Sequence, residues 1–165
     1  MLVVGIDPGT ATTGYGFVKE KTGKIEAVAY GVITTPAGLA PELRLLLLYN
    51  QLRELFLLHQ PEHGAVEKLF FQRNVSTATA VGQARGVVML VFAQNNMQVG
   101  EYNPMEVKQA VVGYGGAEKK QVQQMVKAIL GLKEIPKPDD AADALAVTIC
   151  HLNSYRFLSS QTEGE

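Results

Sequence analysis

Two acidic side chains stand directly behind short apolar runs, where they could bind a metal ion or a phosphate-bearing ligand. Asp7 follows VVGI and precedes a Pro-Gly pair, and Glu67 follows Ala65-Val66. The apolar runs predict buried strands, so both carboxylates are expected at strand ends, on the solvent edge of a sheet. Asp7 has a second interpretation, because an aspartate before a turn can hydrogen-bond that turn as an Asx residue.

Two further acids, Asp140 and Asp143, open the segment DDAADALAVTICHL. A spacing of three residues places both carboxylates on one face of the first helical turn, near the positive end of the helix dipole. These acids need have no function beyond stability, because acidic residues in the first turn stabilise a helix. In that interpretation Asp139 is suited to be the N-cap. Asp139 is four residues from Asp143, so it can share the same face.

Four carboxylates at one end of a sheet indicate a metal site. Two carboxylates about 4 Å apart repel by roughly 4 kcal/mol at an effective dielectric constant near 20, which exceeds the benefit of a helix cap. Cations must therefore compensate such a cluster. Because the expected ligands are all oxygens, Mg²⁺ or Mn²⁺ is favoured over zinc. Two such ions can assist an in-line phosphoryl displacement.

The predicted elements bring these acids to one edge of an α/β fold. Five strands are expected, at residues 2–7, 63–69, 97–102 and as two strands within 14–35 that meet at a turn on residues 22–24. Four helices are expected, from Pro41 to near Gln60, at 76–95, within 111–130 after a glycine-rich loop, and from Asp140 to about Phe157. The resulting fold is a mixed sheet, with three antiparallel and two parallel strands, covered by helices on both faces.

One amphipathic segment makes a finer prediction. In the helix within 111–130, Val122, Met125, Val126 and Ile129 should face inward, and Lys120, Gln123, Gln124 and Lys127 outward.

Composition places the chain among globular cytoplasmic proteins. Its 165 residues suffice for one domain, which we assign to residues 1–158, with a frayed polar tail at 159–165. Apolar residues make up 47% and charged residues 19%, which excludes a disordered or fibrous chain. The single Cys150 lies in an apolar stretch and suits a reducing compartment. The longest apolar run, residues 87–93, is too short to span a membrane, and a net charge of -1 gives no sign of DNA binding.

Five segments resemble the RuvC family of bacterial Holliday-junction resolvases, over nearly the full chain: GIDPGT…TGYG, VEKLFF, GQARGVV, EYNPMEVKQAVVGYGGAEKKQVQQMV and DDAADALAVTICH. The resemblance implies an RNase H-like fold and a homodimer that nicks four-way DNA junctions in recombination and repair, together with the RuvA-RuvB branch-migration complex. It also implies two Mg²⁺ ions per active site, with Mn²⁺ as a substitute, held by the catalytic acids Asp7, Glu67, Asp140 and Asp143. The family's D-A-A-D-A-L pattern favours Asp140 over Asp139.

The same resemblance implies DNA contacts for four residues. Phe70 is the expected base-stacking residue at the junction centre, although Phe71 competes with it and either ring can fill a core gap instead. Arg73 would hold a nearby phosphate, and Lys108 and Lys119 would lie close to the scissile phosphate. An exposed position without function is the alternative for all three cations.

Gly82 and Gly86 lie one helical turn apart in the helix expected at 76–95. Because glycine weakens a helix by roughly 1 kcal/mol relative to alanine, close packing is the expected reason for both. The packing partner is either a second copy of the chain or the sheet. The histidines are expected to be structural or surface residues: His59, His63 and His151.

Other functions compete with junction cleavage. GIDPGT also resembles the first phosphate loop of actin-like ATP-binding phosphotransferases, but that class needs two related domains and a second glycine-rich loop, which 165 residues do not supply. A related RNase H-like nuclease would act on ribosomal RNA precursors. A module that binds junctions without cutting them is a further alternative, and the four acids argue against it.

Overall fold

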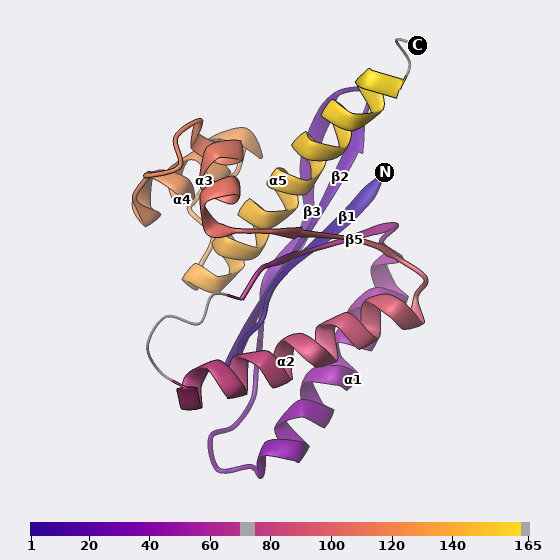
Figure 1. The fold of residues 1–165 in the computed structure, drawn as a ribbon, viewed down its shortest axis with the longest axis vertical. Helices are drawn as coiled ribbons and strands as arrows, with labels where there is room; N and C mark the ends of the chain where they lie inside the picture. Colours follow the sequence, from indigo (N-terminus) through magenta and orange to yellow (C-terminus); the bar gives the residue numbers. More distant parts are fainter. Residues whose placement is uncertain (70–74, 163–165) are drawn as a thin grey trace.

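The computed structural model describes residues 1–69 and 75–162 (Figure 1). Five strands form one sheet: β1 (Leu2–Asp7), β2 (Thr12–Lys21), β3 (Lys24–Thr34), β4 (His63–Glu67) and β5 (Gln98–Tyr102). Their order across the sheet is β3-β2-β1-β4-β5. β1, β2 and β3 are antiparallel neighbours, whereas β1, β4 and β5 run parallel. The predicted mixed sheet is therefore confirmed.

A tight turn joins β2 to β3 where the sequence predicted it. Thr22 and Gly23 have φ angles of 51° and 82°, the left-handed conformations that a two-residue hairpin turn of type I′ requires. The Glu20 carboxylate accepts a hydrogen bond from the Gly23 N–H at 2.8 Å. Strand β2 of this hairpin pairs with β1 along the full length of β1, up to Asp7.

Helices cover both faces of the sheet, as predicted. One face carries α1 (Pro41–His59) and α2 (Val75–Gln94), and the other carries α3 (Pro104–Val112), α4 (Lys119–Ile129) and α5 (Asp139–Thr162) (Figure 1). α5 lies along β1 and β2, and both α3 and α4 pack against α5. None of the helices in the described ranges is long and apolar enough to cross a membrane.

The central strand β1 is buried on both faces, because its side chains alternate between two cores. Val4 packs in the core of α1 and α2 with Leu52, and Val3 packs in the core of α5 with Leu145. A strand between two helical layers needs apolar residues at successive positions. This requirement explains the uninterrupted apolar run that ends at Asp7.

Helix α3 was not among the predicted elements. The Asn103 side chain accepts a hydrogen bond from the Glu106 N–H at 2.8 Å, and the Glu106 carboxylate accepts one from the Asn103 N–H at 2.6 Å. This capping box, with Pro104 in the first turn, starts the helix. The sequence NPME at residues 103–106 is typical of a helix start. The helix itself has only nine residues, too few to show a clear hydrophobic period.

Two other helices differ from the prediction in detail. In α4, Met125 is 37% exposed and Gln123 only 9%, the reverse of the predicted orientation. α5 continues to Thr162, past the expected end near Phe157, so residues 159–162 of the expected tail are helical. Residues 163–165 lie outside the described part of the chain.

Candidate active site

The end of β1 places Asp7 beside the first turn of α5. In the sheet, Asp7 pairs with Gly14 of β2. The backbone of α5 fills the space that a side chain at Gly14 would need, since a Cβ there would lie 1.9 Å from the Asp140 carbonyl oxygen. Only glycine permits this approach, and it brings Asp140 next to Asp7.

Close packing continues along α5 and fixes its rotation about its own axis. A Cβ at Gly5 would lie 2.2 Å from Thr148 Oγ1. The Thr148 hydroxyl lies 3.0 Å from the Gly16 carbonyl oxygen and 2.8 Å from that of Ala144. This buried contact holds α5 to the strands, and the direction of Asp143 follows from it.

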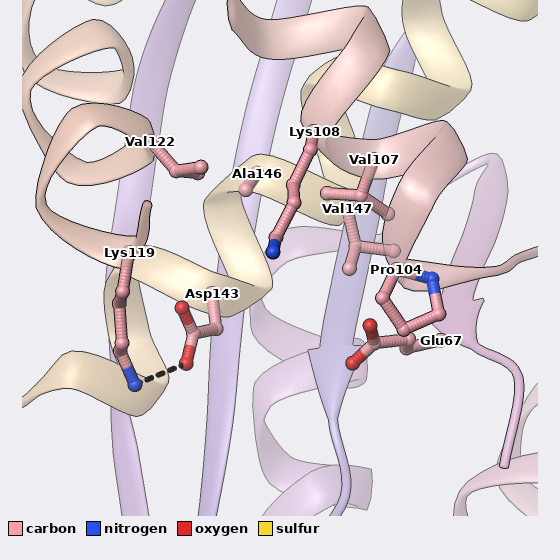
Figure 2. A pocket seen from close by; sticks show the side chains of 9 residues that line it. All are labelled: Glu67, Pro104, Val107, Lys108, Lys119, Val122, Asp143, Ala146 and Val147. Atoms are coloured by element: carbon pink, nitrogen blue, oxygen red, sulfur yellow. Dashed lines mark hydrogen bonds and ion pairs between the residues drawn. The ribbon is translucent and has the colours of Figure 1, made fainter. Parts of the chain in front are cut away.

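The end of β4 adds Glu67 to the same edge. β4 runs parallel to β1, with Ile6 opposite Val66, so Glu67 follows at the level of Asp7. Glu67 and Asp143 line a cavity of about 260 Å³ between β4, α3, α4 and α5. Figure 2 shows Lys108 pointing into this cavity between the two carboxylates.

The acids influence one another's protonation. Burial, and then the charges of Asp143, Glu67 and Asp140, raise the pKa of Asp7 from 3.8 to about 7 against the opposing effect of Lys119. Burial also raises the pKa of Glu67, with Asp143 adding to the effect. These shifts mean that the carboxylates converge and that their charge is incompletely compensated.

Two lysines provide partial compensation. Lys119, at the start of α4, binds Asp143 Oδ2 through Nζ at 3.0 Å and Asp139 Oδ2 at 3.4 Å. Burial lowers the pKa of Lys119, but these two carboxylates outweigh it and hold the pKa above the usual value. The pKa of Asp143 still lies above its ordinary value, because burial opposes the effect of Lys119. Lys108 lowers the pKa of Glu67.

The donor chemistry of this cluster fits a hard divalent cation, because every donor is a carboxylate oxygen. The raised pKa values of Asp7, Glu67 and Asp143 indicate the need for more positive charge. Within residues 1–69 and 75–162, no three His, Cys, Asp or Glu side chains are grouped closely enough to hold a metal ion as they stand. In this arrangement Lys119 occupies Asp143 Oδ2.

A histidine pair ties β4 to α5 away from the acids. His63 Nδ1 lies 3.1 Å from His151 Nε2, and Tyr102 Oη lies 2.9 Å from His151 Nδ1. Burial, and then the neighbouring His63, lower the pKa of His151 to about 4. The pair bridges the two elements that carry Glu67 and Asp143.

Most of the predicted site residues lie in the described part of the chain. Glu67, Asp143, Lys108 and Lys119 line the cavity in Figure 2. Asp140 lines a second cavity, on the side of α1 and α2. Asp139, which the sequence left open, pairs with Lys119. Three predicted positions lie outside the described residues: Phe70, Phe71 and Arg73.

Known proteins resemble the chain over almost its whole length. The model of the family described as crossover junction endodeoxyribonuclease RuvC matches residues 3–151. A crossover junction endodeoxyribonuclease RuvC of Syntrophomonas wolfei is 55% identical over 159 residues, which span 96% of this chain and 92% of that protein. The protein of the same name from Moorella thermoacetica is 57% identical over 151 residues, 92% of this chain and 90% of that one.

Solved structures agree with these matches. The structure described as T. thermophilus RuvC in complex with Holliday junction substrate superposes with a TM-score of 0.87 and is 35% identical, covering 95% of this chain and 96% of that one. The chain belongs to the RuvC family. The yeast mitochondrial Holliday junction resolvase Ydc2, at 16% identity and a TM-score of 0.63, shares the fold. The predicted RNase H-like fold is confirmed.

Proposed function

We propose that the protein is a crossover junction endodeoxyribonuclease that resolves four-way (Holliday) DNA junctions by paired nicks, in recombination and DNA repair. The observation that carries the proposal is the convergence of Asp7, Glu67 and Asp143: burial, and then the charges of Asp143 and Glu67, raise the pKa of Asp7 to about 7. Such a cluster suits hydrolysis of phosphodiesters with divalent cations. In each nick, water adds to phosphorus and the bond to the 3′ oxygen breaks, which leaves a 5′ phosphate and a 3′ hydroxyl.

The proposed cofactor is Mg²⁺, with two ions per active site and Mn²⁺ as a substitute. Asp7, Glu67, Asp140 and Asp143 would hold the ions, which when bound activate water and stabilise charge on the phosphate. The protein contributes rigid placement, because these acids stand at the ends of β1 and β4 and in the first turn of α5. Glycines under α5 keep that turn against the sheet.

Lys108 and Lys119 are the proposed contacts with the scissile phosphate. Both line the cavity that holds Glu67 and Asp143 (Figure 2). A cation beside each acid can attract the phosphodiester and offset the charge that develops on its oxygens in the transition state. Phe70 is proposed to stack on an unpaired base, and Arg73 to hold a phosphate nearby.

A homodimer through α2 is the proposed assembly, because two sites are needed for paired nicks. A Cβ at Gly86 would meet no atom within 4 Å among the described residues, and one at Gly82 would meet only Leu69 Cδ1, at 3.9 Å. The sheet therefore gives no packing reason for these glycines. Leu90, one turn further on, is 52% exposed, so the three residues offer a surface on which a second copy can pack closely.

The remaining assignments are also proposals. Cooperation with the RuvA-RuvB complex and a cytoplasmic location follow from the family resemblance and the composition, and we treat residues 1–158 as one nuclease domain. The alternatives of an actin-like phosphotransferase or a nuclease for ribosomal RNA precursors receive no support from the family match over residues 3–151.

Incubation with a labelled synthetic four-way junction and Mg²⁺ tests the proposal. The native protein should make symmetric paired nicks, and Asp7→Asn should bind the junction without cutting it. A linear duplex and an RNA duplex serve as control substrates, and ATP turnover is measured in parallel. Equal cleavage by Asp7→Asn, or a preference for RNA, would overturn the assignment.

A further inference from the structure

A second cavity opens on the other side of the acid cluster from Lys108 and Lys119. Its volume is about 550 Å³, and it lies between the loop after Asp7, the first turns of α1 and α2, and the start of α5. The polar or charged side chains in its wall are Thr10, Thr12, Arg44, Thr77 and Asp140.

Among the described residues that line this cavity, Arg44 carries the positive charge, and hydrogen bonds hold its side chain in place. Its Nε donates to Thr35 Oγ1 at 2.8 Å, and its Nη2 approaches the Thr35 carbonyl oxygen at 3.5 Å. The Thr35 hydroxyl donates in turn to the Thr10 carbonyl oxygen at 2.5 Å. Arg44 is therefore anchored, through a largely buried threonine, to the loop that follows Asp7.

This anchoring leaves the charge of Arg44 without an anionic partner among the residues that the structure describes. Both of its hydrogen bonds go to uncharged oxygens of Thr35. In the described part of the chain, Arg44 takes part in no ion pair, and Nη1 makes no hydrogen bond. Asp140 lines the same cavity but lies beyond ion-pair distance. A half-buried guanidinium that is held in place and unneutralised is suited to bind an anion from outside.

The loop that carries this anchor is itself rigid. Thr13 Oγ1 donates to the Gly9 carbonyl oxygen at 2.6 Å, and Thr10 Oγ1 donates to the Ala80 carbonyl oxygen of α2 at 2.9 Å. The position of Arg44 is therefore fixed relative to both the catalytic edge and α2. A fixed cation beside a reaction centre can orient an extended substrate.

We propose that Arg44 binds a backbone phosphate of the cleaved DNA strand, next to the scissile phosphate and on the side opposite Lys108 and Lys119. Cations would then flank the acids on both sides, so that a strand crossing the site is held at two points with the scissile bond between them. The ligand class is a phosphodiester, because the fork of a guanidinium matches phosphate oxygens. The inference rests on the proposed nuclease function and deepens it.

Junction binding without metal, measured by fluorescence anisotropy over a range of salt concentrations, tests this role. Arg44→Gln removes the charge, and Arg44→Lys keeps it without the Nε–H. Arg53→Gln is the matched control, because Arg53 lies on the same helix, is exposed and stacks over Tyr49. Thermal unfolding is recorded for each variant so that binding is compared among folded proteins.

Loss of one phosphate contact should weaken the salt dependence as well as the affinity. Arg44→Gln should raise Kd about tenfold at 50 mM salt and about threefold at 200 mM, since the slope of log K against log salt falls by about 0.9 per contact. Arg44→Lys should restore the slope, and Arg53→Gln should behave as the native protein. Weaker binding with an unchanged slope would make Arg44 a structural residue and overturn the inference, as would native affinity in Arg44→Gln. If the native protein itself cuts no junction, the nuclease proposal fails instead.

Discussion

Replacing Asp7 by Asn should stabilise the metal-free protein at alkaline pH, although it removes a proposed metal ligand. In the native protein the pKa of Asp7 lies at about 7, because of burial and then of the charges of Asp143, Glu67 and Asp140. Its ordinary value is 3.8. The folded protein therefore holds a proton that the unfolded chain releases between these two pH values.

The sign and size of the effect follow from this difference. Stability conferred by protonated Asp7 is present at low pH and is lost as pH rises from about 4 to about 7. A rise in pKa from 3.8 to about 7 corresponds to about 4 kcal/mol of unfolding free energy at 1.36 kcal/mol per pKa unit. Asn carries no such charge. The advantage of Asp7→Asn should therefore grow by about 2 to 3 kcal/mol between pH 5 and pH 8.

Thermal unfolding followed by circular dichroism in EDTA measures this advantage. For a domain of this size, about 4 kcal/mol corresponds to a rise in Tm of roughly 10 °C at pH 8. Glu54→Gln is the control, since Glu54 is an exposed acid of α1 outside the cluster, and it should shift Tm little at either pH. Adding Mg²⁺ should raise the Tm of the native protein more than that of Asp7→Asn, because bound cations neutralise the repulsion.

Two outcomes would contradict this prediction for Asp7→Asn. One is a Tm for Asp7→Asn below the native value at pH 8 in EDTA, which would mean that ionised Asp7 is stabilised by its surroundings. The other is a difference in Tm that does not change with pH, which would mean that neither burial nor the charges of Asp143, Glu67 and Asp140 raise the pKa of Asp7 in the folded protein.

Other substitutions test the packing and assembly of the protein. Gly14→Ala should lower both Tm and junction cleavage, because its Cβ would lie 1.9 Å from the Asp140 carbonyl oxygen and displace α5. A native Tm together with native cleavage would show that α5 does not need glycine at this position. Leu52→Ala removes a fully buried side chain and should lower the unfolding free energy by about 3 kcal/mol in urea titrations, while cleavage well below Tm is retained. Gly86→Glu should weaken self-association in sedimentation equilibrium without lowering Tm, and an unchanged association constant would remove α2 from the proposed interface.

The fold was largely predictable because its strands are short apolar runs that end at turns, and its long helices are extended apolar segments bounded by turn-forming residues. β1 lies between two helical layers, so both of its faces need apolar residues. The two-residue turn at Thr22 and Gly23 is restricted to the few turn types that can join adjacent antiparallel strands. The hydrophobic pattern did not reveal α3, because nine residues are too few to show a clear helical period. Its signal was the local chemistry of Asn103 and Glu106, which cap each other's backbone.

The candidate site was predictable only in part. Acids at the ends of β1 and β4 converge because adjacent parallel strands end at the same edge. The division between Asp143, which lines one cavity, and Asp140, which lines the other, depends on how α5 is rotated. That rotation is set by contacts such as Asp140 against Gly14, which no helical period reveals. The anchoring of Arg44 by Thr35 likewise joins residues from separate elements.

Anomalous diffraction from a crystal of the protein with junction DNA and Mn²⁺ would show whether the four acids hold the metal ions. We expect two manganese peaks per active site, within bonding distance of carboxylate oxygens from Asp7, Glu67, Asp140 and Asp143, with Lys119 turned away from Asp143. A map with no peak at Asp7, under conditions in which the native protein cuts the junction, would contradict the account.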